Sequence, residues 1–305
     1  MLCKQICFLA LVFVCFSLSL DASKIEHVII VSVDGLRPDA ISAQNSPVIE
    51  TLKKNGVWAN HAQTIMPSVT LPSHTSMLTG RSVEVHKVTW NDYDESKKDA
   101  VKVPTCLEVA SRQGLSTAMF VGKEKFKHLQ SSNGAVYFAW PASDAPGITK
   151  AVLAYESQNG LPRLTFIHYP DTDVAGHRYG WMSSAYLAAL KKIDNSLAEL
   201  VALVQNKAYQ ENTVIILTAD HGGKGKTHGR DIPDDMQIPW LASGGSIQAG
   251  QIYEKPIVTY DTAATALFLL DVAVPSEWNG KALRLPMKNK TENRKMLHGK
   301  ATKQS

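Results

Sequence analysis

The sequence predicts an α/β protein with a mostly parallel central sheet and helices on both of its faces. Three apolar, β-branched runs, at 27–33, 164–169 and 213–218, are typical of strands that are buried on both sides. Segments with helical spacing alternate with these runs, which favours parallel strands joined by crossover helices. The 305 residues, 44% hydrophobic and 20% charged, suit a globular chain and exclude a disordered or multi-span membrane protein.

The first half of the chain contains two strands and three helices. The run His27–Val33 is apolar almost throughout, and 46–55 has apolar residues at helical spacing before Gly56. Pro72 fits the first turn of a helix that runs to about Thr79. A short helix over 105–112 then leads to a strand over 117–121.

The second half continues the same alternation. The apolar run at 164–169 predicts a strand, and a long apolar stripe predicts an amphipathic helix over 183–205. The run at 213–218 is as apolar as the first strand, and 238–242 can form another strand. A strongly apolar segment at 262–270 predicts the last helix. Residues 23–285 therefore read as one domain.

The first 22 residues are typical of a secretory signal peptide. Lys4 precedes an apolar run at 6–20, and small residues lead to a cleavage site near Ala22. A membrane span needs roughly 20 apolar residues, so this run is short for an anchor, although an uncleaved anchor is the alternative. We expect a secreted or periplasmic protein with no membrane span after cleavage.

Cysteine content and charge place further bounds. Three of the four cysteines lie in the signal segment, so the mature chain keeps Cys106, for which we expect a plain buried thiol. Residues 286–305 hold six basic residues and one acid and are predicted to be a flexible basic tail. The formal net charge of +4 comes from this tail, so we expect no nucleic-acid binding by the folded body. The oligomeric state stays open.

Acidic and imidazole side chains follow three of the predicted strands. Asp34 comes after the first strand, Asp173 and His177 after the strand at 164–169, and Asp220–His221 after the strand at 213–218. Ligands bind beyond the carboxyl ends of strands in open α/β sheets, so these side chains are expected to converge. Clustered carboxylates need a cation, and their mixture with imidazoles favours zinc or a similar metal over magnesium or calcium.

The details of spacing support a site for two metal ions. Gly176, between Asp173 and His177, would allow a tight turn that brings both side chains to one ion. His228 follows in a Gly- and Lys-rich loop and is a further candidate ligand. Asp171 is a less suitable ligand, because the four-residue step to His177 fits Asp173 better. Lys123 follows another strand end and could meet a phosphate.

Thr70 is expected just before the helix that has Pro72 in its first turn. Free N–H groups at such a helix start suit a phosphate group, and a metal-activated hydroxyl there can act as a nucleophile. The alternative for Thr70 is a simple helix cap.

Together, these motifs resemble the alkaline phosphatase superfamily, and within it the nucleotide pyrophosphatase/phosphodiesterase branch and its compact bacterial relatives. The resemblance covers almost the whole mature body. It is carried by VSVDGLR at 31–37, PSVTLPSHTSMLTG at 67–80, DVAGH at 173–177, TADHG at 218–222, and HG at 228–229 with MQIPW at 236–240.

The resemblance implies an alkaline-phosphatase-like catalytic domain with two zinc ions. One ion would be held by Asp34, Thr70, Asp220 and His221, and the other by Asp173, His177 and His228. Thr70 would be the nucleophile that forms a phosphothreonine. Asn91 falls where the branch places an asparagine that binds a phosphoryl oxygen, although its flanking residues match poorly and a turn residue is the alternative.

The predicted activity is that of a phosphoric ester hydrolase, which would cleave phosphodiester or pyrophosphate bonds in a small-molecule phosphate ester. A phosphomonoesterase or a phosphoryl-transfer enzyme of the same fold is the alternative, and a non-catalytic metal-binding protein is a distant one. The sequence shows no pattern for a third metal or a guanidinium that would meet the extra charge of a monoester, which favours diesters. His228 follows His221 closely, so an inserted substrate-capping segment is missing there.

Overall fold

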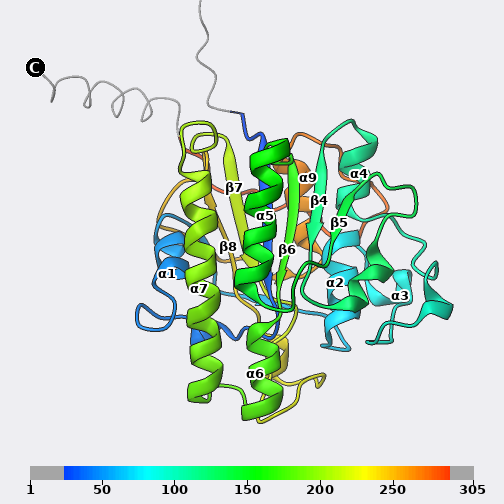
Figure 1. The fold of residues 1–305 in the computed structure, drawn as a ribbon, viewed down its shortest axis with the longest axis vertical. Coiled ribbons are helices and arrows are strands. Elements are labelled where there is room, and N and C mark those ends of the chain that lie inside the picture. The colour runs from blue at the N-terminus through cyan, green and yellow to red at the C-terminus, as the bar shows by residue number, and fades with distance from the viewer. Residues whose placement is uncertain (1–23, 289–305) are drawn as a thin grey trace, which may run out of the picture.

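The apolar runs form the middle of an eight-stranded sheet in the computed structural model, which describes residues 24–288 (Figure 1). Its strand order is β5-β4-β6-β1-β7-β8-β2-β9, and a separate two-stranded sheet pairs β10 with β3. The strands are β1 His27–Val33, β2 Gly56–Ala59, β3 Ala62–Gln63, β4 Thr117–Phe120, β5 Tyr137–Ala139, β6 Leu164–Tyr169, β7 Thr213–Thr218, β8 Trp240–Gly244, β9 Gln251–Tyr253 and β10 Ile257–Val258.

Five neighbouring strands, from β5 to β7, run parallel, whereas β8 is antiparallel to both β7 and β2. The centre of the sheet is β1, where Val28 lies opposite Leu164 of β6 and Val214 of β7. All seven residues of β1 are buried, as its unbroken apolar pattern predicts. The mostly parallel sheet that the sequence predicts is therefore confirmed.

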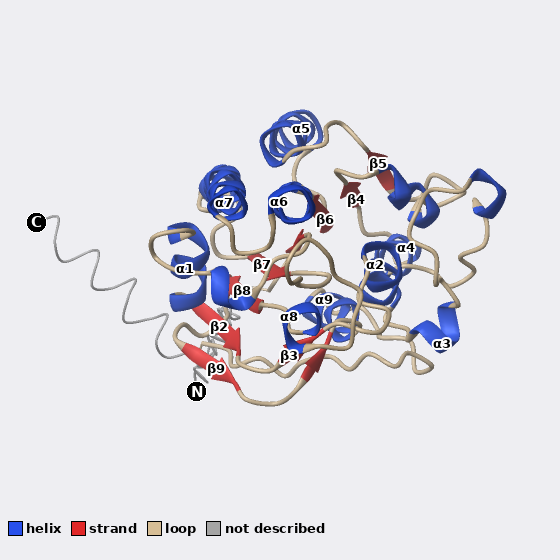
Figure 2. Cartoon of the chain, turned by 90° about the horizontal axis from the view of Figure 1, so that it is seen from below, coloured by secondary structure: helices blue, strands red, loops and turns tan. Residues whose placement is uncertain are grey.

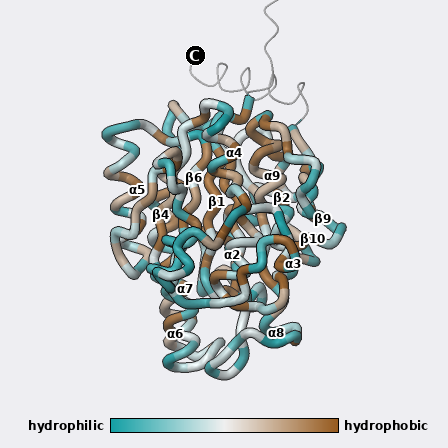
Figure 3. Tube along the Cα trace, turned by 90° about the vertical axis from the view of Figure 1, so that its right-hand side faces the viewer, coloured by the Kyte–Doolittle hydropathy of each residue, from teal (hydrophilic) through white to brown (hydrophobic). Residues whose placement is uncertain are grey.

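Helices cover both faces of this sheet. One face carries α1, α5 and α7, which pack on one another, and the other carries α2, α4 and α9 (Figure 2). The hydropathic colouring shows the apolar residues gathered along β1, β4 and β6 between these layers (Figure 3). The helices are α1 Pro47–Lys54, α2 Thr70–Thr79, α3 Val83–His86, α4 Cys106–Arg112, α5 Ala145–Asn159, α6 Asp171–Tyr179, α7 Ser184–Val204, α8 Pro233–Met236 and α9 Asp261–Leu269, with 3-10 turns at Pro38–Ala40, Glu95–Lys97 and Glu124–Leu129.

Among the features of the fold that differ from the sequence prediction are the helices α5 and α2. The helix α5 was not predicted, because Pro146 and Gly147 in its first turn read as a loop; Asp144 caps it by accepting a hydrogen bond from the Gly147 N–H at 3.1 Å. The helix α2 has Pro72 in its first turn, as predicted, but Thr70 is its first residue rather than the residue before it, and the Thr70 side chain makes no capping hydrogen bond.

The remaining predictions about the chain concern its ends and its cysteine. The signal segment lies outside the described residues, as does the basic tail from 289 onward; Lys288 donates its N–H to Ser246, which ties the start of that tail to the body. Between residues 24 and 288, no helix has the length and apolarity to cross a membrane.

Cys106 is buried, and burial raises the pKa of its thiol to about 12, as expected for an inert thiol.

The buried side chain of His86 predicts that the stability of the fold depends on pH. Its Nδ1 accepts the N–H of Val88 at 3.0 Å, so its Nε2 carries the proton and donates to Ser76 Oγ at 2.9 Å. Burial lowers the pKa of His86 to about 4, from an ordinary value of 6.5. Between these two pH values, the unfolded chain therefore binds a proton at His86 more readily than the folded protein does.

We therefore predict that His86 weakens the fold as pH falls from 6.5 to 4, by ~1–3 kcal/mol in the free energy of unfolding. Urea titrations at several pH values would measure this. His86→Gln should flatten the dependence relative to the natural protein, and the same change at the exposed His61 should not. Equal slopes for all three proteins would contradict the assignment.

Candidate metal centre and active site

The predicted acidic residues meet at the carboxyl edge of the parallel strands. Asp34 directly follows β1, and Asp220 and His221 follow β7, which is the neighbour of β1 in the sheet. The N–H of Gly35 donates to Asp220 Oδ1 at 3.0 Å and joins the two strand ends. Gly35 has a positive φ of 70°, and an added Cβ would lie 3.2 Å from Asp173, so glycine is required at this crossing.

Asp173 and His177 approach the same edge from α6. The sequence predicted a tight turn at Gly176, and that prediction is wrong: the two residues lie one helical turn apart on one face of α6. Gly176 serves packing instead, because an added Cβ would lie 2.6 Å from the ring of Trp181. His177 Nε2 lies 3.3 Å from Asp173 Oδ1, so the helix brings both side chains together as a turn would have.

Backbone carbonyls fix the orientation of three histidine rings. Nδ1 of His177, His221 and His228 lies 2.8–3.0 Å from the carbonyl oxygens of Lys226, Gly222 and Ser68, respectively. A carbonyl only accepts, so each Nδ1 carries the proton and each Nε2 presents a lone pair. The Nε2 atoms of His177 and His228 lie 3.1 Å apart, a contact that needs a proton or a cation between them.

Three buried carboxylate oxygens face these lone pairs. Asp34 Oδ1, Asp173 Oδ1 and Asp220 Oδ2 accept no hydrogen bond from any described residue. Buried polar atoms are almost always paired, and a carboxylate oxygen opposite an imidazole lone pair can be satisfied by a metal ion. This donor set, with its protonated Nδ1 atoms, fits a metal centre.

The ligand atoms fall into two groups that share His221. Asp34, Asp220 and His221 offer atoms within 4.8 Å of one another, and so do Asp173, His221 and His228. His177 adjoins the second group, since its Nε2 is near both Asp173 and His228. The structure thus brings together all six of the aspartates and histidines that the sequence singled out. Mixed carboxylate and imidazole ligands of this kind suit zinc-like ions.

The charges of the cluster also favour the binding of added cations. Burial opposes ionisation of Asp34, but Lys123 and His168 hold its pKa well below the ordinary value. Burial and the nearby charge of Asp34 raise the pKa of Asp220 well above its ordinary value. One lysine therefore does not satisfy all the carboxylates. Burial lowers the pKa of His221 to about 4, which keeps its ring neutral and able to bind a metal.

Thr70 stands at the N-terminus of α2 and faces this cluster. Its side chain is almost fully buried, and its Oγ1 lies 3.5 Å from Nε2 of His221, the residue that both ligand groups share. Ser73 Oγ anchors the same helix turn by donating to the Asp220 carbonyl at 2.7 Å. Asn91 Oδ1 accepts the N–H of Leu71 at 2.8 Å, which leaves the Nδ2 donors of Asn91 without a partner in residues 24–288.

Two residues that surround Asp34 were missed or underrated in the sequence. His168 is fully buried in β6; its Nδ1 accepts the Gly122 N–H at 3.2 Å, and its Nε2 donates to Asp34 Oδ2 at 2.8 Å. It looks like one more residue of an apolar strand, so only the pairing of β1 with β6 reveals it. Lys123 follows β4 and lies 2.7 Å from Asp34 and 2.6 Å from Asp173.

Asp171 is not part of the cluster. Its Oδ2 accepts the Ala145 N–H at 2.8 Å, and its Oδ1 pairs with Lys192 at 3.0 Å, so it ties α6 to α5 and α7.

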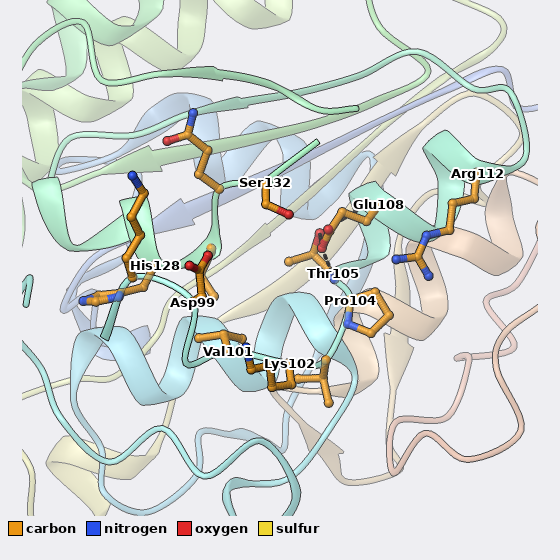
Figure 4. Close-up of a pocket in the computed structure, with 13 residues that line it drawn as sticks. Asp99, Val101, Lys102, Pro104, Thr105, Glu108, Arg112, His128 and Ser132 are labelled. Atoms are coloured by element: carbon orange, nitrogen blue, oxygen red, sulfur yellow. Dashed lines mark hydrogen bonds between the residues drawn. The ribbon is translucent and has the colours of Figure 1, made fainter. Parts of the chain in front are cut away.

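A polar cavity of about 250 Å³ also lies apart from the site (Figure 4). Lys102, Thr105, Glu108 and Arg112 are among its lining residues, and none of the predicted ligands is.

Comparison with known proteins agrees with this geometry. Residues 28–237 match the family described as type I phosphodiesterase/nucleotide pyrophosphatase, and the chain belongs to this family. Human bis(5'-adenosyl)-triphosphatase ENPP4 is 26% identical over 215 residues, which cover 64% of this chain and 47% of that protein. Human ectonucleotide pyrophosphatase/phosphodiesterase family member 1 is 26% identical over 219 residues, which cover 63% and 23%, respectively. The chain thus spans about half or less of the length of these relatives.

Solved structures show the same fold. Murine ectonucleotide pyrophosphatase/phosphodiesterase 5, solved as an inactive variant in complex with AMP, matches with a TM-score of 0.70 and 14% identity over 83% of this chain and 97% of that one. A putative sulfatase from Bacteroides thetaiotaomicron matches with a TM-score of 0.69 and 16% identity over 85% and 74%, respectively. The alkaline-phosphatase-like fold that the sequence predicts is confirmed.

Proposed function

We propose that this protein hydrolyses phosphodiester or pyrophosphate bonds through a phosphothreonine formed on Thr70. The observation that carries the proposal is the position of Thr70 Oγ1, which lies 3.5 Å from Nε2 of His221, a residue that belongs to both candidate ligand groups. Membership of the type I phosphodiesterase/nucleotide pyrophosphatase family supports the same reaction. The nucleophile, the ligand assignment and the role of Asn91 are all parts of this proposal.

Two zinc ions are the metals that we assign to the site. Asp34, Asp220 and His221, with Thr70, would hold one, and Asp173, His177 and His228 would hold the other. When bound, the ions would supply positive charge that favours ionisation of the attacking hydroxyl and neutralises charge on the phosphoryl oxygens. The backbone carbonyls that orient the three rings keep the Nε2 atoms available for this ligation.

The residues of the chain then divide the chemical steps. Thr70 Oγ1 gives up its proton to solvent as it attacks phosphorus. A new P–O bond forms, and the bond to the leaving oxygen breaks with its electron pair on that oxygen, which gains a proton from solvent. Water then attacks the phosphothreonine and returns Thr70 to its hydroxyl form. Asn91, whose Oδ1 is held by the N–H of Leu71, would donate its amide N–H groups to a phosphoryl oxygen.

The proposed substrate is a small-molecule phosphate ester. A phosphomonoesterase or a transferase of the same fold would use the same Thr70. These activities differ in the kind of ester that is cleaved and in whether water or another molecule accepts the phosphoryl group. Comparing 4-nitrophenyl phosphate, bis(4-nitrophenyl) phosphate and thymidine 5'-(4-nitrophenyl phosphate) as substrates would separate these activities. Export to a secreted or periplasmic location, from the segment at 1–22, is part of the proposal and lies outside the described residues.

We predict that protein purified without added metal contains about two zinc ions per chain. His228→Ala should weaken binding at the site with Asp173 and His177 by at least about tenfold and leave the other site largely filled. Elemental analysis and competition with a chelator dye would measure both affinities. Full turnover in a chelator, with no transition metal in the protein, would rule out the metal centre.

We predict that Thr70→Ala lowers kcat/KM by at least about a thousandfold, because the covalent route is lost. Thr70→Ser keeps the hydroxyl and should retain part of the activity. The same zinc content in all three proteins would show that the loss is chemical. If Thr70→Ala turns over at a near-normal rate, then Thr70 is not the nucleophile.

A further inference from the structure

Lys123 is the one lysine that contacts the carboxylates of the candidate metal centre among residues 24–288. Its Nζ lies 2.7 Å from Asp34 Oδ2 and 2.6 Å from Asp173 Oδ2, so it joins one aspartate from each ligand group. The other oxygen of each carboxylate, Oδ1, has no hydrogen-bond partner in that part of the chain. The ammonium therefore occupies one side of both carboxylates and leaves the opposite side for metal ions.

Lys123 has one N–H donor left with which to contact a substrate. An ammonium has three N–H donors, and the two aspartates use two of them. Its side chain is 18% exposed, whereas those of Asp34 and Asp173 are 0% and 5% exposed, so Lys123 is the member of this trio that reaches solvent. The third donor is available to a phosphoryl oxygen at the same sheet edge as Thr70.

A second cation stands beside it. Lys125 is two residues further along, in the 3-10 turn Glu124–Leu129, and forms no ion pair with any described residue. Burial and the neighbouring charge of Lys123 lower the pKa of Lys125, and the negative charges of Asp34, Asp92 and Asp173 oppose this shift. An extra negative charge on a ligand would relieve the repulsion between these two ammonium groups.

We propose that Lys123, assisted by Lys125, is a specificity-determining residue that binds a dianionic phosphoryl group, so that the site accepts monoester or terminal phosphoryl groups as well as diesters. This inference rests on the proposed function, since it concerns the phosphoryl group that Thr70 attacks. It assigns to a lysine the extra positive charge for which the sequence showed neither a third metal nor a guanidinium. A diester, with one negative charge, gains less from the contact.

The test compares two esters with the same leaving group, 4-nitrophenyl phosphate and bis(4-nitrophenyl) phosphate, on the full zinc-loaded chain. Lys123→Met should lower the monoester-to-diester ratio of kcat/KM by at least about tenfold, as expected for loss of a charge-assisted hydrogen bond. Lys123→Arg should recover part of that ratio. Lys127→Met is the matched control, because Lys127 lies in the same turn but pairs with Glu124 instead.

An equal loss for both esters in Lys123→Met would overturn the proposal and reduce Lys123 to a support for the aspartates. An unchanged ratio would overturn it as well. If Lys123→Met does not fold, Lys125→Met decides, with an expected fall in the ratio of about threefold; no fall would count against the proposal.

Calorimetric binding of inorganic phosphate to the zinc-loaded protein separates this inference from the proposed function, because it needs no turnover. The affinity for phosphate should fall by at least about tenfold in Lys123→Met and stay unchanged in Lys127→Met. Unaltered phosphate affinity in Lys123→Met overturns the inference even if both esters are hydrolysed. A protein that binds phosphate through Lys123 but hydrolyses neither ester would uphold the inference and refute the proposed function.

Discussion

The burial of several carboxylates at one edge of the sheet is the constraint on which the rest of this site depends. Asp34, Asp173 and Asp220 are almost completely shielded from water, and each keeps one oxygen without a hydrogen bond among the described residues. Like charges in such a place are tolerated only if cations compensate them. Lys123 supplies one positive charge, and the lone pairs of the surrounding imidazoles supply places for metal ions.

The scaffold holds these groups through contacts that reach into the core. Trp181 Nε1 and the Tyr186 hydroxyl both donate to the Gly35 carbonyl at 2.9 Å, next to Asp34. Trp181 also packs against Gly176 of α6 and Gly223 of the loop after β7, where a larger residue would clash with its ring. The same ring thus contacts both segments. The start of α2 is held by two hydrogen bonds, one from Ser73 to the Asp220 carbonyl and one from the N–H of Leu71 to Asn91. The position of Thr70 relative to His221 is thus set by several independent elements, which suits a reaction that needs accurate alignment.

Much of this arrangement could be predicted from the sequence because it depends on strands. The ranges of β1, β6 and β7 follow from predominantly apolar runs, and the polar residues directly after them mark the carboxyl edge. The pairing of Asp173 with His177 was predicted correctly, but the helix that carries them was not, because Gly176 resembles a turn residue. The helix α5 was missed for a similar reason, since its Pro and Gly belong to a capped first turn.

His168 and Lys123 show where prediction from the sequence stops. Both bind Asp34, but they lie in β6 and after β4, far from Asp34 along the chain. A histidine inside an apolar strand has no local pattern that marks it as functional. The strand-end position of Lys123 suggested a phosphate contact but gave no sign of its contact with Asp34. Only the strand order β4-β6-β1 places them next to Asp34. The candidate ligands could be named from motifs, whereas the charges that surround them needed the fold.

In the proposed reaction, the phosphoryl group is transferred first to Thr70 and only then to water. The stereochemical course of hydrolysis tests this claim most directly, with a phosphorothioate diester of known configuration and isotopically labelled water as reactants. Attack by Thr70 followed by attack by water gives two inversions, so the account predicts net retention at phosphorus. Net inversion would mean that water attacks the substrate directly, and would contradict the phosphothreonine route.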